Sequence, residues 1–227
     1  MYTQLVKKVA KAIAAFLFSV GITLPVFAQE QGPERWEESI QKFEKRDAQN
    51  PVEPGANLFV GSSSVAIWQD VSDYFPDHQI LNRGFGGSQF SDLLYYVDRV
   101  VYPYKPSKVF IYEGDNDIAA GDSPKQIMKE AKKLRKLIKK ELGDTPVVFI
   151  SPKPSVARWE MKDKYEELNA KLKKYADKKK NTQYADVWNP ALDENGMVFT
   201  NIFREDNLHM NAEGYKIWQK ALEPYLE

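Results

Sequence analysis

The sequence of 227 residues has no cysteine and only two histidines, His78 and His209. A chain without cysteine forms no disulfide and offers neither a thiol nucleophile nor a thiolate metal ligand. Two histidines are too few for a histidine-rich zinc site, so we expect no bound metal and no cofactor. Basic and acidic side chains number 32 each, and this balance gives no sign of a nucleic-acid partner.

Long apolar runs are also scarce. The most apolar stretch spans residues 13–27, follows three lysines and gives way to a polar segment. This pattern is typical of a secretory signal peptide, here residues 1–28. Gly21 and Pro25 interrupt the run, which is short for a membrane span, so an uncleaved anchor is the less favoured alternative. We expect cleavage near Ala28, export to a periplasm or the cell exterior, no stable membrane insertion afterwards, and a net charge of about −3.

Residues 29–55 are predicted to form an amino-terminal helix and a linker. Pro33 suits the first turn of a helix over residues 32–50, and Trp36, Ile40 and Phe43 share one face of that helix. We expect this helix to pack outside the core. Residues 56–227 then form one domain without an internal repeat, and the mature chain is long enough to bury a well-packed core.

Short apolar segments alternate with longer amphipathic ones through this domain. Strands are predicted at 58–61, 79–82, 108–112, 147–150 and 184–187, with helices at 90–101, 123–143 and 211–226 and a charged helix before the last strand. Ser123, Pro124 and Gly143 supply start and stop signals for one of these helices. Parallel neighbours need crossover connections, so the alternation predicts an α/β fold whose parallel sheet carries helices on both faces.

Two lysine-rich stretches, 132–140 and 171–180, fall within predicted helices. Acidic and apolar residues interleave with their lysines. This mixture is typical of solvated helix faces rather than of nucleic-acid-binding patches.

The first predicted strand runs directly into the segment 61–64 (GSSS). A serine here lies at the carboxyl end of a strand and at the amino end of a helix, where free backbone N–H groups and the helix dipole favour developing negative charge. Such an environment suits acyl-transfer chemistry. The alternative is that these serines only cap the helix, which is the commoner role of serine at a helix start.

Two further polar segments follow the second and third strands. The glycines of 82–88 (NRGFGGS) let backbone N–H groups approach a ligand, but Gln89 replaces the third glycine of a dinucleotide fingerprint, so nucleotide binding is disfavoured. In 113–117 (EGDND), the side-chain amide of Asn116 can donate a hydrogen bond to an oxyanion. The alternatives for that segment are an ordinary polar turn or a divalent-cation loop built from its three carboxylates.

The fourth segment, 206–209 (DNLH), precedes the last predicted helix. Asp206 stands three residues before His209, close enough for one turn to orient the imidazole ring. Ligands of an open parallel sheet bind beyond the carboxyl ends of its strands, so we expect all four segments to meet there.

In this order, the four segments resemble the motifs of the SGNH hydrolases, also called the GDSL family, over residues 58–226. The resemblance implies a three-layer α/β/α sandwich with a flavodoxin-like, five-stranded parallel sheet. It implies that Ser63 is the nucleophile, His209 the general base and Asp206 its orienting partner. It further implies an oxyanion hole made of the N–H groups of Ser63 and Gly87 and the side-chain amide of Asn116.

Two positions depart from the family pattern. Ser62 stands where the family usually has aspartate, and Asn207 stands where glycine is frequent. A serine at the first position can still accept local backbone hydrogen bonds.

Residues after the fourth strand are candidate substrate contacts. Lys153 lies in the proline-containing segment 151–155, with Arg158 and Trp159 just beyond. Lys153 or Arg158 is predicted to contact a polar or anionic part of the substrate, and Trp159 to stack on a sugar. The alternative is that the prolines shape a loop and Trp159 packs on the core.

We therefore expect an exported serine esterase that hydrolyses short-chain carboxylic esters through an acyl-enzyme, with O-acetyl groups on carbohydrates as one substrate class. The sequence contains no long apolar insertion that could form a lid over the site. This absence favours short acyl chains. The alternatives are a lysophospholipase or thioesterase, an acyltransferase, and a catalytically silent glycan-binding module on the same fold. The sequence leaves the oligomeric state open.

Overall fold

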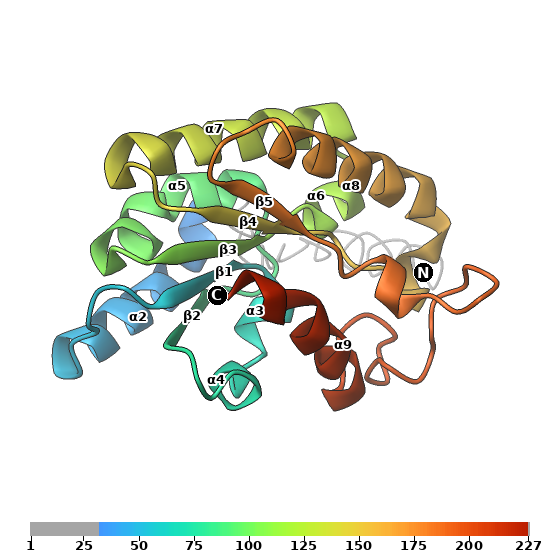
Figure 1. The fold of residues 1–227 in the computed structure, drawn as a ribbon, viewed down its shortest axis with the longest axis horizontal. Coiled ribbons are helices and arrows are strands. Elements are labelled where there is room, and N and C mark those ends of the chain that lie inside the picture. Colours follow the sequence, from blue (N-terminus) through green and yellow to red (C-terminus); the bar gives the residue numbers. More distant parts are fainter. Residues whose placement is uncertain (1–31, 227) are drawn as a thin grey trace, which may run out of the picture. The chain divides into compact units, whose positions relative to one another are not determined.

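The computed structural model of the protein describes residues 32–226 (Figure 1). The predicted signal peptide lies outside the described residues. Five strands form one parallel sheet in the order β2-β1-β3-β4-β5, which is the flavodoxin-like order. The strands are β1 (Asn57–Gly61), β2 (Ile80–Gly84), β3 (Lys108–Tyr112), β4 (Val147–Ile150) and β5 (Thr182–Ala185).

The predicted strand bounds are confirmed for β3 and β4, whereas β2 continues to Gly84 and β5 begins at Thr182 rather than at 184. Every residue of β1 and β4 is buried. Continuous burial is expected when helices cover both faces of a parallel sheet.

Alternate residues of each strand point to opposite faces, and each face has its own apolar cluster. One cluster packs against α5 (Phe90–Val100), α7 (Pro124–Leu142) and α8 (Lys162–Ala176). The other packs against α3 (Ser63–Ala66), α4 (Val71–Tyr74) and α9 (Ala212–Leu222). The two groups of helices lie on opposite sides of the sheet (Figure 1), which confirms the predicted three-layer α/β/α sandwich.

Aromatic side chains fill the layer between the sheet and α9. The rings of Phe59 on β1 and Phe110 on β3 stack with centroids 4.5 Å apart, and Trp68 stacks on Tyr215 at 4.7 Å. Such pairs contribute about 0.5–1.5 kcal/mol each beyond the burial of their surface. They therefore fix α9, and the loop that precedes it, against β1, the strand that leads into Ser63.

Short helical segments complete the chain. They are η1 (Pro33–Trp36), α6 (Asp115–Ala119), η2 (Tyr102–Tyr104), η3 (Val156–Met161), η4 (Asn189–Ala191) and η5 (Glu223–Tyr225). The sequence did not predict α6, because its residues read as a polar turn. Gly114 makes this helix start possible: its φ of +107° turns the chain sharply out of β3, and a Cβ there would lie 2.8 Å from Leu168 Cδ2.

The start and end signals predicted for α7 are confirmed. The hydroxyl of Ser123 accepts a hydrogen bond from the N–H of Gln126, whose side chain in turn binds the N–H of Ser123 in a capping box. Gly143 ends the helix with a φ of +65°.

The expectation that the amino-terminal helix packs outside the core is wrong. α2 (Glu37–Gln49) follows η1 directly, and its Ile40 is fully buried in the cluster beneath α5. Arg99 of α5 pairs with both Glu37 and Glu44, at 2.7 and 2.6 Å. The buried guanidinium of Arg83 also forms an ion pair with Asp47 at the end of α2. The helix is therefore an integral part of the described unit.

Candidate active site

Ser63 lies where β1 ends and α3 begins. Gly61, with a φ of +128°, turns the chain there, and a Cβ at this position would collide with the carbonyl oxygen of Tyr112. Ser62 occupies the N-cap position of α3, but its side chain makes no capping hydrogen bond. Ser63 is the first residue inside the helix, so its hydroxyl is not used as the helix cap and faces a different partner.

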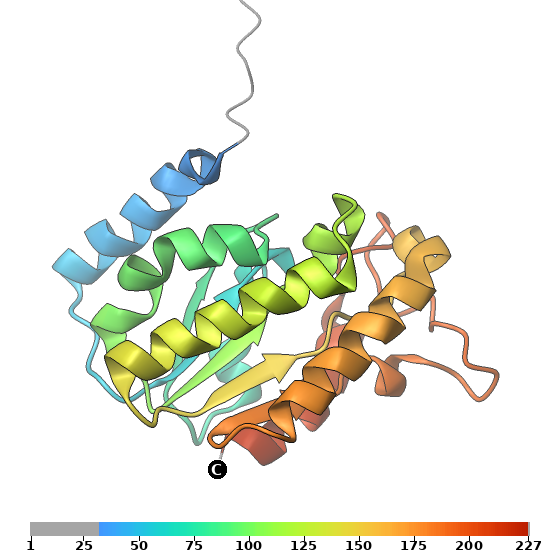
Figure 2. The same cartoon turned by 90° about the horizontal axis from the view of Figure 1, so that it is seen from above.

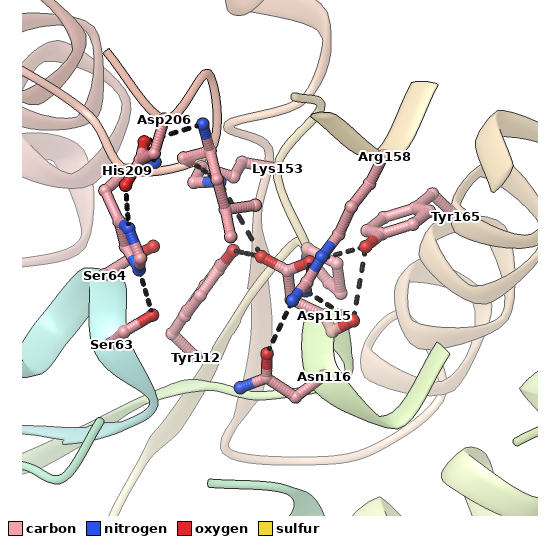
Figure 3. A network of polar contacts seen from close by, with 12 residues as sticks. Ser63, Ser64, Tyr112, Asp115, Asn116, Lys153, Arg158, Tyr165, Asp206 and His209 are labelled. Atoms are coloured by element: carbon pink, nitrogen blue, oxygen red, sulfur yellow. Dashed lines mark hydrogen bonds and ion pairs between the residues drawn. The ribbon is translucent and has the colours of Figure 1, made fainter. Parts of the chain in front are cut away.

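That partner is the imidazole of His209. Its Nε2 lies 2.9 Å from the Ser63 Oγ, and its Nδ1 lies 2.6 Å from Asp206 Oδ2 (Figure 3). The carboxylate beside Nδ1 favours a proton on that nitrogen, which leaves the Nε2 lone pair directed at the serine hydroxyl. The three side chains predicted from the sequence therefore come together as a Ser-His-Asp arrangement.

Local hydrogen bonds shape the loop that carries Asp206. Its Oδ1 accepts the N–H groups of Leu208 at 2.9 Å and His209 at 2.8 Å. The hydrogen bond with His209 holds the pKa of the Asp206 carboxyl well below its ordinary value. Asn207, which follows Asp206, has a φ of +56°, a conformation that asparagine tolerates better than most residues. This tolerance explains how asparagine can stand at a position where the family frequently has glycine.

The loop that carries Gly87, one of the predicted oxyanion-hole residues, lies beside Ser63. A Cβ on Gly86 would lie 3.8 Å from the Cα and Cβ of Ser63, so this loop packs directly against the serine. Gly87 has a φ of +82°, which orients its peptide in a way that few other residues allow. The Asn116 Nδ2 donates to the Ser88 carbonyl at 2.9 Å, which ties α6 to the same loop and leaves one amide proton for another acceptor.

The amino-terminal segment also reaches this loop. A Cβ on Gly87 would lie 3.1 Å from Cη2 of Trp36, whose ring packs edge-on against Phe85 with centroids 6.0 Å apart. Trp36 therefore packs directly against the glycine turn.

A network of charged and polar side chains lies behind Asn116 (Figure 3). Arg158 donates from Nη2 to Asn116 Oδ1 at 3.1 Å and from Nη1 to Asp115 Oδ1 at 2.5 Å. Asp115 also accepts the hydroxyls of Tyr112 and Tyr165. Burial acts to raise the pKa of Asp115, but the cations of Lys153 and Arg158 and the two hydroxyls together hold the pKa below its ordinary value.

The structure gives Lys153 a different place from the predicted substrate contact. Its side chain is only 2% exposed, and its ammonium donates to the Leu208 carbonyl at 2.7 Å while lying 3.7 Å from Asp115 Oδ2. Lys153 therefore holds the peptide next to His209 instead of facing solvent. The sequence gave no signal for the direction of this side chain.

Arg158 and Trp159 also have partners within the protein. The guanidinium of Arg158 is engaged by Asp115 and Asn116, with 18% of the side chain exposed. The Trp159 ring stacks on Trp188 with an interplanar angle of 12°, and the ammonium of Lys162 lies over it. Stacking of Trp159 on a sugar stays a prediction.

Two buried acids, which the sequence analysis considered only as ligands of a divalent cation, support the glycine turn. Glu113 is 1% exposed and accepts the Ser88 hydroxyl at 2.6 Å, while Asp117 accepts the N–H groups of Phe90 and Gly114 at 3.0 Å. Burial raises the pKa of Glu113 well above its ordinary value and that of Asp117 to about 7. The carboxylates of the segment 113–117 therefore tie loops together instead of facing one common cation.

No group of three or more His, Cys, Asp and Glu side chains between residues 32 and 226 is placed to hold a metal ion. No helix in that range is long and apolar enough to cross a membrane.

Comparison with known proteins connects this geometry to a family. The model of the GDSL-like lipase/acylhydrolase family matches residues 55–217. A structure from Streptococcus pneumonia that is named for platelet activating factor superposes with a TM-score of 0.77 at 22% identity, covering 86% of this chain and 94% of the other. A GDSL-like lipase from Bacteroides thetaiotaomicron gives 0.70 at 21% identity, covering 82% and 96%.

A third similar structure is a mutant of an acetyl-xylooligosaccharide esterase from Geobacillus Stearmophilus, with a TM-score of 0.63 at 15% identity, covering 77% of this chain and 95% of the other. No curated protein matches the chain. At these identities the structures show the fold, while the family model covers most of the chain and confirms the resemblance seen in the four segments. The chain therefore belongs to the GDSL-like lipase/acylhydrolase family, the SGNH hydrolases, and is an esterase by family.

Proposed function

We propose that this protein is a serine esterase that removes short acyl groups, and that O-acetyl groups on carbohydrates are its substrate class. The observation that carries the proposal is the hydrogen-bonded chain from Ser63 through His209 to Asp206, with spacings of 2.9 and 2.6 Å. A nucleophile, a base and an orienting carboxylate in this arrangement are what acyl transfer to a hydroxyl requires.

In the proposed reaction, neutral His209 takes the Ser63 proton at Nε2 while Ser63 Oγ forms a bond to the carbonyl carbon of the ester. The N–H groups of Ser63 and Gly87 and the amide of Asn116 donate to the resulting oxyanion. His209 then gives its proton to the leaving alcohol as the carbon–oxygen bond breaks. Water, deprotonated by the same imidazole, attacks the acyl-enzyme and releases the acid and free Ser63.

Three observations support the substrate class. The side chains of His209 and Asp206 are 27% and 47% exposed, so the catalytic edge is open enough to accept an acyl group attached to a bulky chain. One structurally similar protein is an acetyl-xylooligosaccharide esterase. The signal-peptide pattern of residues 1–28 supports export, and exported enzymes meet acetylated glycans outside the cytoplasm.

The proposal is tested with p-nitrophenyl esters of increasing acyl length and with an acetylated xylooligosaccharide, for the wild type and for Ser63→Ala. We expect the highest kcat/KM on the acetyl ester, a decline with acyl length, acetate release from the oligosaccharide, and loss of all of these in the variant. Hydrolysis that is unchanged in a folded Ser63→Ala protein would exclude the mechanism. A preference for long acyl chains would retain the mechanism and exclude the substrate class.

A further inference from the structure

A second concave site lies between α7 and α8, where β5 begins. It is a groove of about 660 Å³, within the range of about 300–1,000 Å³ that is usual for ligand pockets. Six lysines and one arginine line it, together with Tyr175 and Thr182, and no carboxylate does. The two lysine-rich stretches of the sequence thus converge on one groove.

The arginine of this groove, Arg135, is buried without an acidic partner. Only 4% of it is exposed. Its Nε donates to Thr182 Oγ1 at 2.8 Å and its Nη2 to the Asn181 carbonyl at 3.1 Å, whereas its Nη1 is buried and has no hydrogen-bond partner among the described residues. A buried cation is costly unless it is paired, so this guanidinium has a donor left for an acceptor that the chain does not supply.

The lysines around Arg135 are also poorly neutralised. Lys139 and Lys180 share one carboxylate, Asp144, at 3.1 and 3.9 Å. Lys136 and Lys140 are exposed and form no ion pair within residues 32–226. The ammonium of Lys132 lies over the Tyr175 ring, 5.7 Å from its centroid, again without an acid. Seven cations therefore surround the groove with a single carboxylate at its margin.

This groove is separate from the catalytic edge. β5 begins at Thr182, so the groove lies at the amino ends of the strands, whereas Ser63 and His209 lie beyond their carboxyl ends. α7 and α8 run side by side away from the catalytic edge (Figure 2). The groove is lined by the second half of α7, by Tyr175 in the last turn of α8, and by residues between α8 and β5. The charge surplus therefore has no direct part in ester hydrolysis.

We propose that this groove binds a phosphate group that carries two or more negative charges, or several phosphates together. A guanidinium with a free donor and several mobile ammonium groups suit the many acceptor oxygens of phosphate, and the charge surplus suits a multiply charged ligand better than a single carboxylate. The phosphate belongs either to a soluble molecule or to a lipid headgroup. This inference does not depend on the proposed esterase function.

Removing Arg135 itself would also release the carbonyl of Asn181 and the hydroxyl of Thr182, so the test uses exposed lysines. In one variant Lys132, Lys136 and Lys140 are all replaced by glutamine. The matched control replaces Lys125, Lys129 and Lys133, which are exposed on the same helix but do not line the groove. Both variants lose the same charge from α7, and their thermal unfolding is compared with that of the wild type.

Sodium pyrophosphate is titrated calorimetrically into each protein at constant ionic strength. We expect saturable binding to the wild type and the control variant, and a loss of about tenfold or more in affinity for the groove variant, because charge-assisted hydrogen bonds are removed. Equal losses of affinity in both variants would overturn the proposal. So would a wild-type protein that binds neither pyrophosphate nor the phospholipid vesicles described next.

Co-sedimentation with vesicles of phosphatidylglycerol and phosphatidylcholine distinguishes the two sources. Binding that pyrophosphate displaces and that only the groove variant loses identifies a lipid headgroup. Pyrophosphate binding without vesicle binding identifies a soluble phosphorylated ligand. Vesicle binding that survives equally in both variants would show a general charge effect and would contradict a site in this groove.

Discussion

Arg158 is predicted to act on catalysis through Asn116 rather than on the substrate. It donates to Asn116 Oδ1 at 3.1 Å, which fixes the amide so that its NH₂ group faces Ser88 and the proposed oxyanion. Replacement by methionine removes this contact but leaves Asp115 with Lys153 at 3.7 Å and the hydroxyls of Tyr112 and Tyr165. The variant should therefore fold.

The expected size of the effect follows from two limits. A hydrogen bond from a charged donor contributes about 1.5–3 kcal/mol, and an oxyanion-hole donor contributes about 2.7–4 kcal/mol to the transition state. Loss of positioning cannot cost more than loss of the donor itself, so we expect kcat for Arg158→Met to fall by about 10- to 100-fold. KM for p-nitrophenyl acetate should change little, because no substrate contact is lost.

The assay is a double-mutant cycle with Asn116→Ala. If Arg158 works through Asn116, adding Arg158→Met to Asn116→Ala should lower kcat no further. Losses that multiply, or a rise in KM as the main effect of Arg158→Met, would refute the reasoning and return Arg158 to a substrate contact. Lys162→Met is the control, since it removes a nearby cation that pairs with Glu166 outside this network.

Three further variants test other parts of the structure. Asn116→Ala should fold normally yet lose about a hundredfold or more in kcat on p-nitrophenyl acetate, and near-normal turnover would remove Asn116 from the oxyanion hole. Glu113→Gln should be more stable than the wild type at neutral pH. The reason is that burial raises the pKa of Glu113, so the folded wild type favours the protonated acid. The stability of the wild type is therefore full below the pKa that Glu113 has in the unfolded chain, and it falls as the pH rises towards the folded pKa. Urea unfolding from pH 4 to 8 should show that the difference in unfolding free energy between Glu113→Gln and the wild type grows with pH. A difference that stays constant would contradict this reasoning. Gly61→Ala should lower the unfolding free energy by at least about 1–3 kcal/mol, because φ is positive there and the new Cβ would collide with the Tyr112 carbonyl. Gly55→Ala is the control: its φ is also positive but nothing lies within 4 Å of the new Cβ, so it should cost less. Equal urea midpoints for the two variants would contradict the collision.

Much of this fold could be predicted because local signals agree with the tertiary arrangement. Apolar runs bounded by polar segments identified β3 and β4 to the residue, and Ser123 and Gly143 marked both ends of α7. The order of the four polar segments placed Ser63, Asn116 and His209 at one edge, because strand direction fixes where the residues after each strand lie.

What the sequence did not predict depends on side-chain direction and long-range pairing. Lys153 was expected to contact the substrate, but the carbonyl of Leu208 and the carboxylate of Asp115 bind its ammonium from distant parts of the chain. The amino-terminal helix was predicted as amphipathic and was expected to pack outside the core. Its attachment depends on pairs such as Arg99 with Glu37, more than sixty residues apart, which periodicity does not report.

The central claim is that Ser63 carries the acyl group during turnover. The most direct measurement is to mix the protein with p-nitrophenyl acetate, quench with acid within the first turnover and locate the acetyl group by mass spectrometry of the peptide spanning Ser62, Ser63 and Ser64. The account predicts an acetyl ester on Ser63 in the wild type and none on any of the three positions after Ser63→Ala. Acetylation at Ser62 or Ser64, or hydrolysis without any acylated serine, would contradict it.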